Sequence, residues 1–268
     1  MSSPFWQETR TQAWRWFLHS KRRPVVVASG LFQPLIWMAL FVLVFQDSMQ
    51  EALGESYLAF VTPGALLFTA FNASLNAGVP VLFDRELGFL DRLRVAPLAD
   101  RLSIVLASAI HIATITLLQC GVILIAALAL GVPFRGGFLG ALLGFTALLL
   151  VVLGFTALSL GLAFQFERHF EMLAVVMIVT LPLIFLSSAF APLDRLPSAL
   201  RVAVLFNPVT LAIEPLRMVF LQADWSLTTP LARTALGTLT PAVCLAGLVL
   251  FVVLASLWSR RVLRRKLA

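Results

Sequence analysis

A dense run of acidic and basic side chains occupies residues 83–98, which read FDRELGFLDRLRVAPL. Carboxylates and guanidinium groups form charge-assisted hydrogen bonds, which are shorter and stronger than neutral ones. The chemistry that this charged segment offers is therefore contact with a partner, and an ordinary solvated turn rich in charges is the alternative. The residues that we expect to make this contact are Asp84, Arg85, Glu86, Gly88, Asp91, Arg92, Arg94 and Pro97.

The spacing within the charged segment predicts a short helix. Phe83, Leu87 and Leu90 follow the i, i+4, i+7 pattern of one helix face. The two Asp-Arg pairs stand seven residues apart, so like charges return to nearly the same side of the helix. Gly88 permits close backbone approach, and Pro97 disfavours helix at the residue before it, which ends the element.

Motifs for catalysis are missing from the sequence. The phosphate-binding motif G-x-x-x-x-G-K-[ST] needs a lysine directly after a glycine, and the only lysines, Lys21 and Lys266, follow His-Ser and Arg-Arg. His19, His111 and His169 are too far apart for a zinc-binding H-E-x-x-H helix, and no G-x-S-x-G motif occurs. We therefore expect no catalytic residue, metal site or cofactor site in this chain.

The composition indicates an integral membrane protein, since 60% of the 268 residues are hydrophobic, 12% are charged and the mean hydropathy is +0.96. A helix needs about 20 mostly apolar residues to cross a bilayer. A transmembrane β-barrel would instead alternate apolar and polar residues over segments of about 10, and the apolar runs here do not alternate. The sequence predicts an all-α fold with six transmembrane helices, at 24–45, 58–82, 102–130, 138–164, 172–190 and 239–258.

The basic residues predict the orientation, because they gather on the cytoplasmic flanks of spans. Most of them lie in the N-terminal segment, the charged segment and the C-terminal tail. We therefore expect both termini in the cytoplasm and a location in the inner (plasma) membrane. The net charge of +7 then reflects topology and attraction to anionic membrane lipids, and no nucleic-acid partner is expected. The segments assigned to the outside hold only Arg135, Arg195, Arg201, Arg217 and Arg233.

The N-terminal residues 1–23 predict an amphipathic helix that lies in the headgroup plane. Trp14, Trp16 and other apolar side chains fall on one half of this helix, and mostly polar side chains fall on the other. A simple basic anchor for the first span is the alternative. We expect the chain to form a single transmembrane domain, with five spans in 24–190 and the last span and a basic tail in 236–268.

The outer region 191–235 is too long for a turn and too apolar for a free loop. Its apolar stretches 196–206 and 209–221 are each too short to cross the bilayer. They predict a pair of re-entrant helices that the rest of the protein covers. Glu214 and Arg217, three residues apart, are expected to pair across one helical turn.

The second predicted span carries hydrogen-bonding side chains where hydrocarbon offers no partners. These residues either line a substrate path or hold helices together. The spans otherwise contain almost no ionisable residue, and His111 lies in the third. An ion gradient therefore has no relay here, so any transport needs energy from a separate protein. The candidate path residues are Thr62, Thr69, Asn72, Ser74 and Asn76.

The order of these parts resembles the permease subunit of an ABC-2 type exporter, in particular its daunorubicin-resistance-like and multidrug branch. The charged segment is similar to the family pattern of acidic-Arg-Glu, Gly, acidic-Arg and Pro. Further matches are residues 187–193, the Asn207-Pro208-Val209-Thr210 motif and the Glu214-Pro215-Leu216-Arg217 motif.

The resemblance implies a cytoplasmic coupling helix between spans 2 and 3, which docks on a separate ATP-binding subunit. That subunit would bind ATP and Mg²⁺, and two copies would serve a permease homodimer. The implied function is export of a lipophilic or amphipathic substrate, such as a drug-like compound or a lipid. Two alternatives stay open, an ABC-2 permease for a lipid-linked polysaccharide and a non-transporting membrane assembly or sensor subunit.

Overall fold

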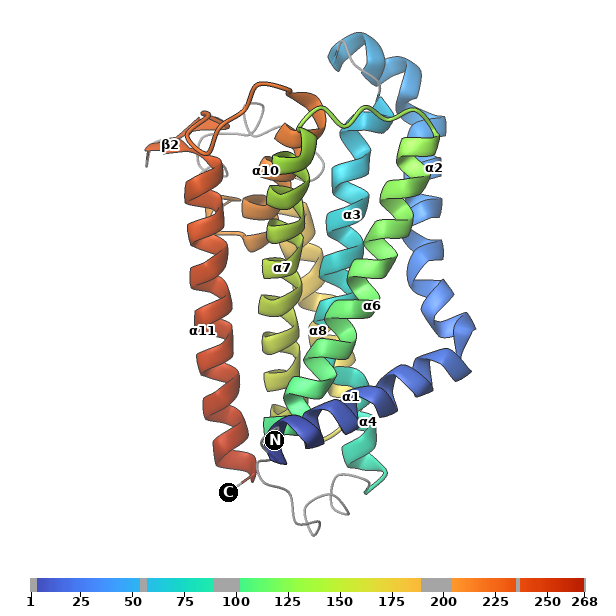
Figure 1. Ribbon diagram of the computed structural model, residues 1–268, viewed down its shortest axis with the longest axis vertical. Helices are drawn as coiled ribbons and strands as arrows, with labels where there is room; N and C mark the ends of the chain where they lie inside the picture. The colour runs from blue at the N-terminus through green and yellow to red at the C-terminus, as the bar shows by residue number, and fades with distance from the viewer. Residues whose placement is uncertain (1–3, 54–56, 89–101, 189–203, 235–236, 268) are drawn as a thin grey trace.

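The computed structural model describes residues 4–53, 57–88, 102–188, 204–234 and 237–267, and they form a bundle of long helices (Figure 1). A small antiparallel sheet of β1 (Ala232–Thr234) and β2 (Gly237–Leu239) precedes the last helix. The sequence did not predict these strands. The helices are α1 (Pro4–Arg22), α2 (Pro24–Leu53), α3 (Tyr57–Leu75), α4 (Gly78–Glu86), α6 (Leu102–Ala129), α7 (Gly137–Gln165), α8 (His169–Phe185), α10 (Pro208–Leu221) and α11 (Pro241–Leu267).

Five helical segments in the described part of the chain are long and apolar enough to cross a membrane, so the protein is a mostly helical, multi-pass membrane protein. They lie in α2, in α3 together with α4, and in α6, α7 and α11. The predicted span 172–190 corresponds to α8, which has 17 residues. At 1.5 Å per residue α8 is about 25 Å long, which is shorter than a hydrocarbon core of about 30 Å. A sixth crossing therefore stays a prediction.

Proline and glycine residues explain several of the helix boundaries. Arg23 separates α1 from α2 because Pro24 disfavours helix at the residue before it. The predicted span 58–82 is divided into α3 and α4 by a turn at Asn76 and Ala77. Helix α4 ends at Glu86, where the sequence had predicted a helix that continues to Pro97.

Gly88 has a positive φ of 71°, and its N–H donates to the carbonyl of Arg85 at 3.0 Å. Glycine adopts this left-handed conformation at little cost and commonly ends helices. Gly88 therefore terminates α4, whereas the sequence had placed it inside a helix. The rest of the predicted helix lies outside the described residues, and so do Asp91, Arg92, Arg94 and Pro97.

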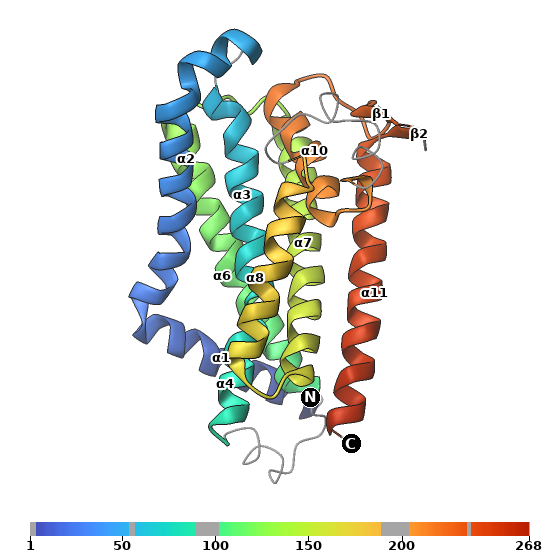
Figure 2. The same cartoon turned by 180° about the vertical axis from the view of Figure 1, so that it is seen from behind.

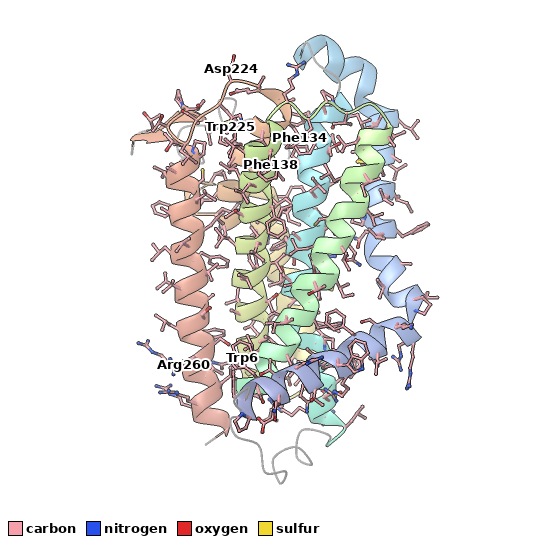
Figure 3. The ribbon with its side chains drawn as sticks, in the orientation of Figure 1. Trp6, Phe134, Phe138, Asp224, Trp225 and Arg260 are labelled. Atoms are coloured by element: carbon pink, nitrogen blue, oxygen red, sulfur yellow. The ribbon has the colours of Figure 1, made fainter. Side chains whose placement is uncertain are left out.

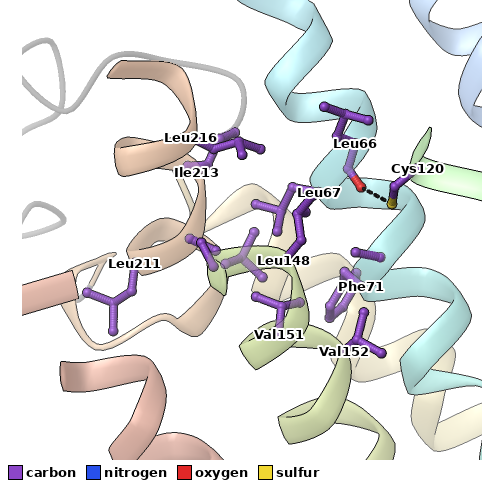
Figure 4. Packing of buried hydrophobic residues seen from close by; sticks show 14 of the residues in the cluster. Leu66, Leu67, Phe71, Cys120, Leu148, Val151, Val152, Leu211, Ile213 and Leu216 are labelled. Atoms are coloured by element: carbon purple, nitrogen blue, oxygen red, sulfur yellow. Dashed lines mark hydrogen bonds between the residues drawn. The ribbon is translucent and has the colours of Figure 1, made fainter. Parts of the chain in front are cut away.

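The core of the bundle lies between α3, α7 and α10 (Figure 4). Of the α3–α4 span 61% is buried, and of the α7 span 50%, against 12% of the α2 span. Phe71 of α3 and Phe155 of α7 meet edge to face with their ring centroids 4.8 Å apart. Such pairs add about 0.5 to 1.5 kcal/mol beyond the area that they bury. Helices α3 and α7 are thus the central pair to which the other helices attach.

Glycines on α7 let two other helices approach closely. The spacing of Gly136, Gly140 and Gly144 predicts close helix packing, and the structure confirms it, because Val219 and Leu216 of α10 cover all three. Farther along α7, Gly154 and Gly161 face Phe251 and Trp258 of α11. An added Cβ would collide with facing atoms at Gly136, Gly154 and Gly161, and it would make a tight contact of 3.0 to 3.2 Å at Gly140 and Gly144.

The two ends of the bundle differ in structure. Both termini lie at one end, where α1 runs across the bundle (Figures 1 and 2). The short helix α10 lies at the other end, near Trp225 and Asp224, whereas Trp6 and Arg260 mark the terminal end (Figure 3). Termini at one end agree with an even number of crossings, and their cytoplasmic location stays a prediction.

Candidate functional site

Helix α4, whose last four residues begin the charged segment, makes polar contacts with α1 and α7 at the terminal end of the bundle. Asp84 accepts a hydrogen bond from Nη2 of Arg15 on α1 at 3.0 Å. Arg85 donates from Nη1 to the backbone carbonyl of Ala163 on α7 at 3.1 Å. The Arg15–Asp84 pair is about one third exposed, so its free energy is of the order of 0.2 to 1 kcal/mol. These contacts orient α4 more than they stabilise the fold.

The third charged residue of α4, Glu86, contacts the beginning of α8. Its carboxylate accepts a hydrogen bond from the backbone N–H of His169 at 2.5 Å and lies 2.7 Å from Nδ1 of the same residue. His169 is the first residue of α8, and a carboxylate is favourable at a helix N-terminus because the free N–H groups and the helix dipole attract it. Phe83 packs on the His169 ring at a centroid distance of 4.3 Å. Asp84, Arg85 and Glu86 therefore connect α4 to three different helices.

Trp16 of α1 belongs to a second apolar cluster at this end. The other members come from α4, α7 and α11, namely Val81, Leu160, Phe164, Val262 and Leu263. The Trp16 ring also stacks on His111 of α6, whose Nε2 lies 2.8 Å from the hydroxyl of Ser20. Trp16 is 8% exposed, whereas Trp14, which the sequence places on the same half of the helix, is 64% exposed and Trp6 is 57% exposed. This helix therefore packs on the bundle with one face and leaves two tryptophans free to meet the membrane surface.

The turn between α3 and α4 is held by one residue of α7. The hydroxyl of Ser159 donates to the carbonyl of Leu75 at 2.5 Å and accepts from the N–H of Gly78 at 2.8 Å. Ser159, Gly78 and Leu75 are almost completely buried. We call residues 75–78 with Ser159 the α3–α4 junction. It joins the membrane-spanning part of the chain to the charged segment.

At the opposite end, Asn207 fixes the beginning of α10. Its Oδ1 accepts from the N–H of Val209 at 2.9 Å, which caps the helix. Its Nδ2 donates to the carbonyls of Leu183, in the last turn of α8, and Leu186, directly after the helix, at 2.6 and 2.8 Å. One buried side chain thus connects the end of α8 to the start of α10.

The end of α10 is fixed by the segment before α7. The backbone N–H groups of Arg135 and Gly136 donate to the carbonyls of Phe220 and Val219, which are among the last carbonyls of a helix and have no partner within it. The Trp225 indole donates to the carbonyl of Gly136 at 3.1 Å. At 14 residues α10 is about 21 Å long, and protein surrounds it on most sides. This agrees with a re-entrant helix, and its partner stretch lies mostly outside the described residues.

A buried ion pair lies on α10. Nη1 of Arg217 is 3.3 Å from Oε1 of Glu214, and their side chains are 9% and 11% exposed. The guanidinium also donates to the carbonyl of Ser188 at 3.1 Å and lies 4.2 Å from the centroid of the Phe60 ring. The predicted pairing is confirmed, and it is more buried than a local surface pair.

The candidate path residues of α3 bond mainly to their own helix. The hydroxyls of Thr62, Thr69 and Ser74 donate to backbone carbonyls four residues earlier, and all three side chains are buried. The amide of Asn76 donates to the carbonyl and the side chain of Asn72. Within the described residues these hydroxyls face neighbouring helices, so their assignment to a substrate path stays a prediction.

Several residues of the site were not found from the sequence. Arg15 and His169 contact the charged segment, and Ser159 contacts Gly78 in the α3–α4 junction, across 69 to 83 positions of chain, and no local pattern marks such contacts. Asn207 had a usable signal, because Asn directly before Pro and an apolar run is a typical helix start. In the described part of the chain, no three His, Cys, Asp or Glu side chains group closely enough to hold a metal ion.

Comparison with known proteins finds one family model and several relatives for this chain. The family model of the ABC-2 type transporter matches residues 7–221. The transport permease ycf38 of Cyanophora paradoxa is 37% identical over 265 residues, which cover 97% of this chain and 90% of the relative. Its counterpart in Porphyra purpurea is 37% identical over 237 residues, 87% of this chain and 81% of the relative. The daunorubicin resistance ABC transporter permease protein DrrB1 of Streptomyces coeruleorubidus is 29% identical over 211 residues, 75% and 71% of the two chains.

Proposed function

The chain belongs to the ABC-2 type transporter family, and we propose that it is the membrane subunit of an exporter in which the charged segment docks on a separate ATP-binding subunit. Membrane subunits of this family work with such a subunit, which carries the ATPase. The observation that carries the proposal is that Asp84, Arg85 and Glu86 connect α4 to α1, α7 and α8. A force on the charged segment would therefore reach three helices at once.

The proposed mechanism uses six crossings, with α8 as the fifth and α10 as a re-entrant helix on the outer side. ATP binding and hydrolysis in the partner would move the charged segment, and the contacts of α4 would pass this movement to α7 and α8. Two copies of the chain would enclose the path between them, which then opens alternately to the two sides. In this scheme Gly88 ends α4, and Asp91, Arg92, Arg94 and Pro97 continue the docking surface.

The proposed cargo is a lipophilic or amphipathic compound. Relatives named for daunorubicin and doxorubicin resistance support this class. A lipid belongs to the same class, because it also presents a large apolar surface to the membrane-embedded path.

Reversal of two charges in the proposed docking surface tests the function. In the Arg92→Glu/Arg94→Glu variant, carboxylates would replace the guanidinium groups that meet the ATP-binding subunit. Like charges brought together cost several kcal/mol, and each 1.4 kcal/mol is tenfold. We expect the affinity for that subunit to fall about a hundredfold and the stimulated ATP hydrolysis of the purified complex to disappear.

The matched control is Arg260→Glu/Arg264→Glu, which reverses two exposed arginines of α11 at the same end of the bundle. This variant is expected to keep the stimulation. Full stimulation in the Arg92/Arg94 variant would exclude the docking role of the charged segment. If co-expressed wild-type chain never stimulates ATP hydrolysis, the alternative of an assembly or sensor subunit replaces the exporter.

A further inference from the structure

The α3–α4 junction interrupts the helical hydrogen-bond pattern in a defined way. Pro80 has no N–H, so the carbonyl of Asn76 cannot accept the bond that a continuous helix would give it. That carbonyl instead accepts from Val79 at 3.1 Å. The N–H of Ala77 likewise bonds three residues back, to the carbonyl of Ser74 at 3.2 Å. These shifted bonds deprive the carbonyl of Leu75 and the N–H of Gly78 of their usual partners within the helix.

Ser159 supplies both missing partners with one hydroxyl. Its Oγ donates to the carbonyl of Leu75 and accepts from the N–H of Gly78. All of these groups are buried, and leaving a buried polar group without a partner costs about 1 to 3 kcal/mol. A side chain of a neighbouring helix inserted into a helix break is a recognised cause of a fixed bend. The turn at residues 76–77 is therefore held by a side chain of a different helix, α7.

Gly78 brings the backbones of α4 and α7 into direct contact. A Cβ atom at Gly78 would lie 2.3 Å from the carbonyl oxygen of Ser159 and 2.8 Å from its carbonyl carbon. Backbone atoms cannot move aside as the end of a flexible side chain can. The start of α4 thus lies against the backbone of α7 at the residue that also makes the two hydrogen bonds.

We propose that Ser159 is a positioning residue that sets the direction in which α4 leaves α3 and makes α3, α4 and α7 move as one unit. The inference rests on the proposed function in one respect, because the movement that it transmits would come from the ATP-binding subunit. The orientation of α4 itself depends only on this chain. Without the Ser159 hydroxyl, α4 remains helical but pivots about residues 76–77, and a force on the charged segment is lost at the junction.

Spin labels test the orientation without any partner. One label at Leu87, which is 80% exposed beyond the end of α4, and one at Leu142, which is 53% exposed on α7, would report how α4 sits. Position 142 is 21 residues from Ala163, so the labels are separated by about 30 Å along α7. Labelled chains are diluted with unlabelled ones in lipid nanodiscs. In Ser159→Ala we expect the population of non-native distances to rise at least about tenfold, because two buried groups lose their hydrogen bonds and each 1.4 kcal/mol is tenfold.

Thr156→Val is the matched control, because Thr156 is also buried on α7, one turn earlier, and its hydroxyl has no hydrogen-bond partner. It should keep the native distance distribution. An unchanged distribution in Ser159→Ala would overturn the inference even if the chain proves to be an exporter.

Stimulated ATP hydrolysis then separates the transmission from the docking. We expect Ser159→Ala to lower the maximal stimulation of ATP hydrolysis about tenfold. The concentration of ATP-binding subunit at half-maximal stimulation should not change. A rise in that concentration would assign Ser159 to docking or general stability and would also overturn the inference. Failure of the wild-type chain to stimulate hydrolysis would refute the proposed function and leave the spin-label result to decide the inference.

Discussion

Replacement of Glu214 by alanine is expected to lower the free energy of unfolding by about 3 kcal/mol, because it leaves a buried guanidinium without its carboxylate. Arg217 and Glu214 are 9% and 11% exposed at a separation of 3.3 Å. The carbonyl of Ser188 and the face of Phe60 stay in place to receive the cation, yet neither carries a compensating negative charge. Chemical denaturation of the purified protein in mixed micelles measures the loss.

A double replacement separates the energy of the Glu214–Arg217 ion pair from the cost of burying its two charges. In Glu214→Leu/Arg217→Met both charges disappear, and apolar side chains in place of a buried ion pair are often neutral or stabilising. The double variant should therefore be more stable than Glu214→Leu alone, and the cycle with the single variants Glu214→Leu and Arg217→Met should give a coupling of at least about 1 kcal/mol. If the stability lost in the double variant equals the sum of the losses in the two single variants, the two residues act independently. The ion pair would then contribute nothing to stability.

The long helices are the part of the fold that the sequence predicts best. The predicted span 138–164 and the observed α7, Gly137–Gln165, differ by one residue at each end. In a bilayer an uninterrupted apolar run of this length has to form a helix, because its backbone groups find no other hydrogen-bond partners. The same argument fails at 58–82, where the run is long and uncharged and the break at Asn76 and Ala77 follows from Pro80 and from Ser159 on another helix.

The ends of the elements depend on contacts that the sequence does not contain. Helix α8 stops at Phe185, five residues before the predicted end at 190. The Ser187 hydroxyl donates to the carbonyl of Ile184 at 2.6 Å, and the Asn207 side-chain amide donates to the carbonyls of Leu183 and Leu186. Serine and asparagine side chains compete with the helix for backbone partners in this way. The apolar run alone gave no reason to end the helix there.

For the charged segment, too, the sequence identifies the residue types that make polar contacts but not their partners. Its composition predicted charge-assisted contacts of Asp84, Arg85 and Glu86 with a partner protein, which stays a prediction, whereas the structure shows the three side chains in polar contact with other helices of the same chain. Their partners within the chain, on α1, α7 and α8, became visible only when the helices were placed side by side. These residues therefore orient α4 inside the protein, which leaves the residues after Gly88 as the part of the segment that the proposed partner would meet first.

Replacement of Asn207 by alanine is expected to lower the free energy of unfolding by about 2 to 4 kcal/mol. The change removes a helix cap worth about 1 kcal/mol and takes the donor from the part-buried hydrogen bonds to the carbonyls of Leu183 and Leu186, each worth about 0.5 to 1.5 kcal/mol. Denaturation in mixed micelles measures the total. Hydrogen exchange in the first turn of α10 and the last turn of α8 shows whether both helix ends loosen.

Asn207→Asp distinguishes the cap from the bridge between α8 and α10. Aspartate caps a helix as well as asparagine does, so the bond from Val209 survives in this variant. The second carboxylate oxygen would, however, face the carbonyls of Leu183 and Leu186 in place of an N–H donor. We expect Asn207→Asp to be at least as unstable as Asn207→Ala. Wild-type stability in the aspartate variant would show that capping alone accounts for this residue, and that α10 is held against α8 by apolar packing.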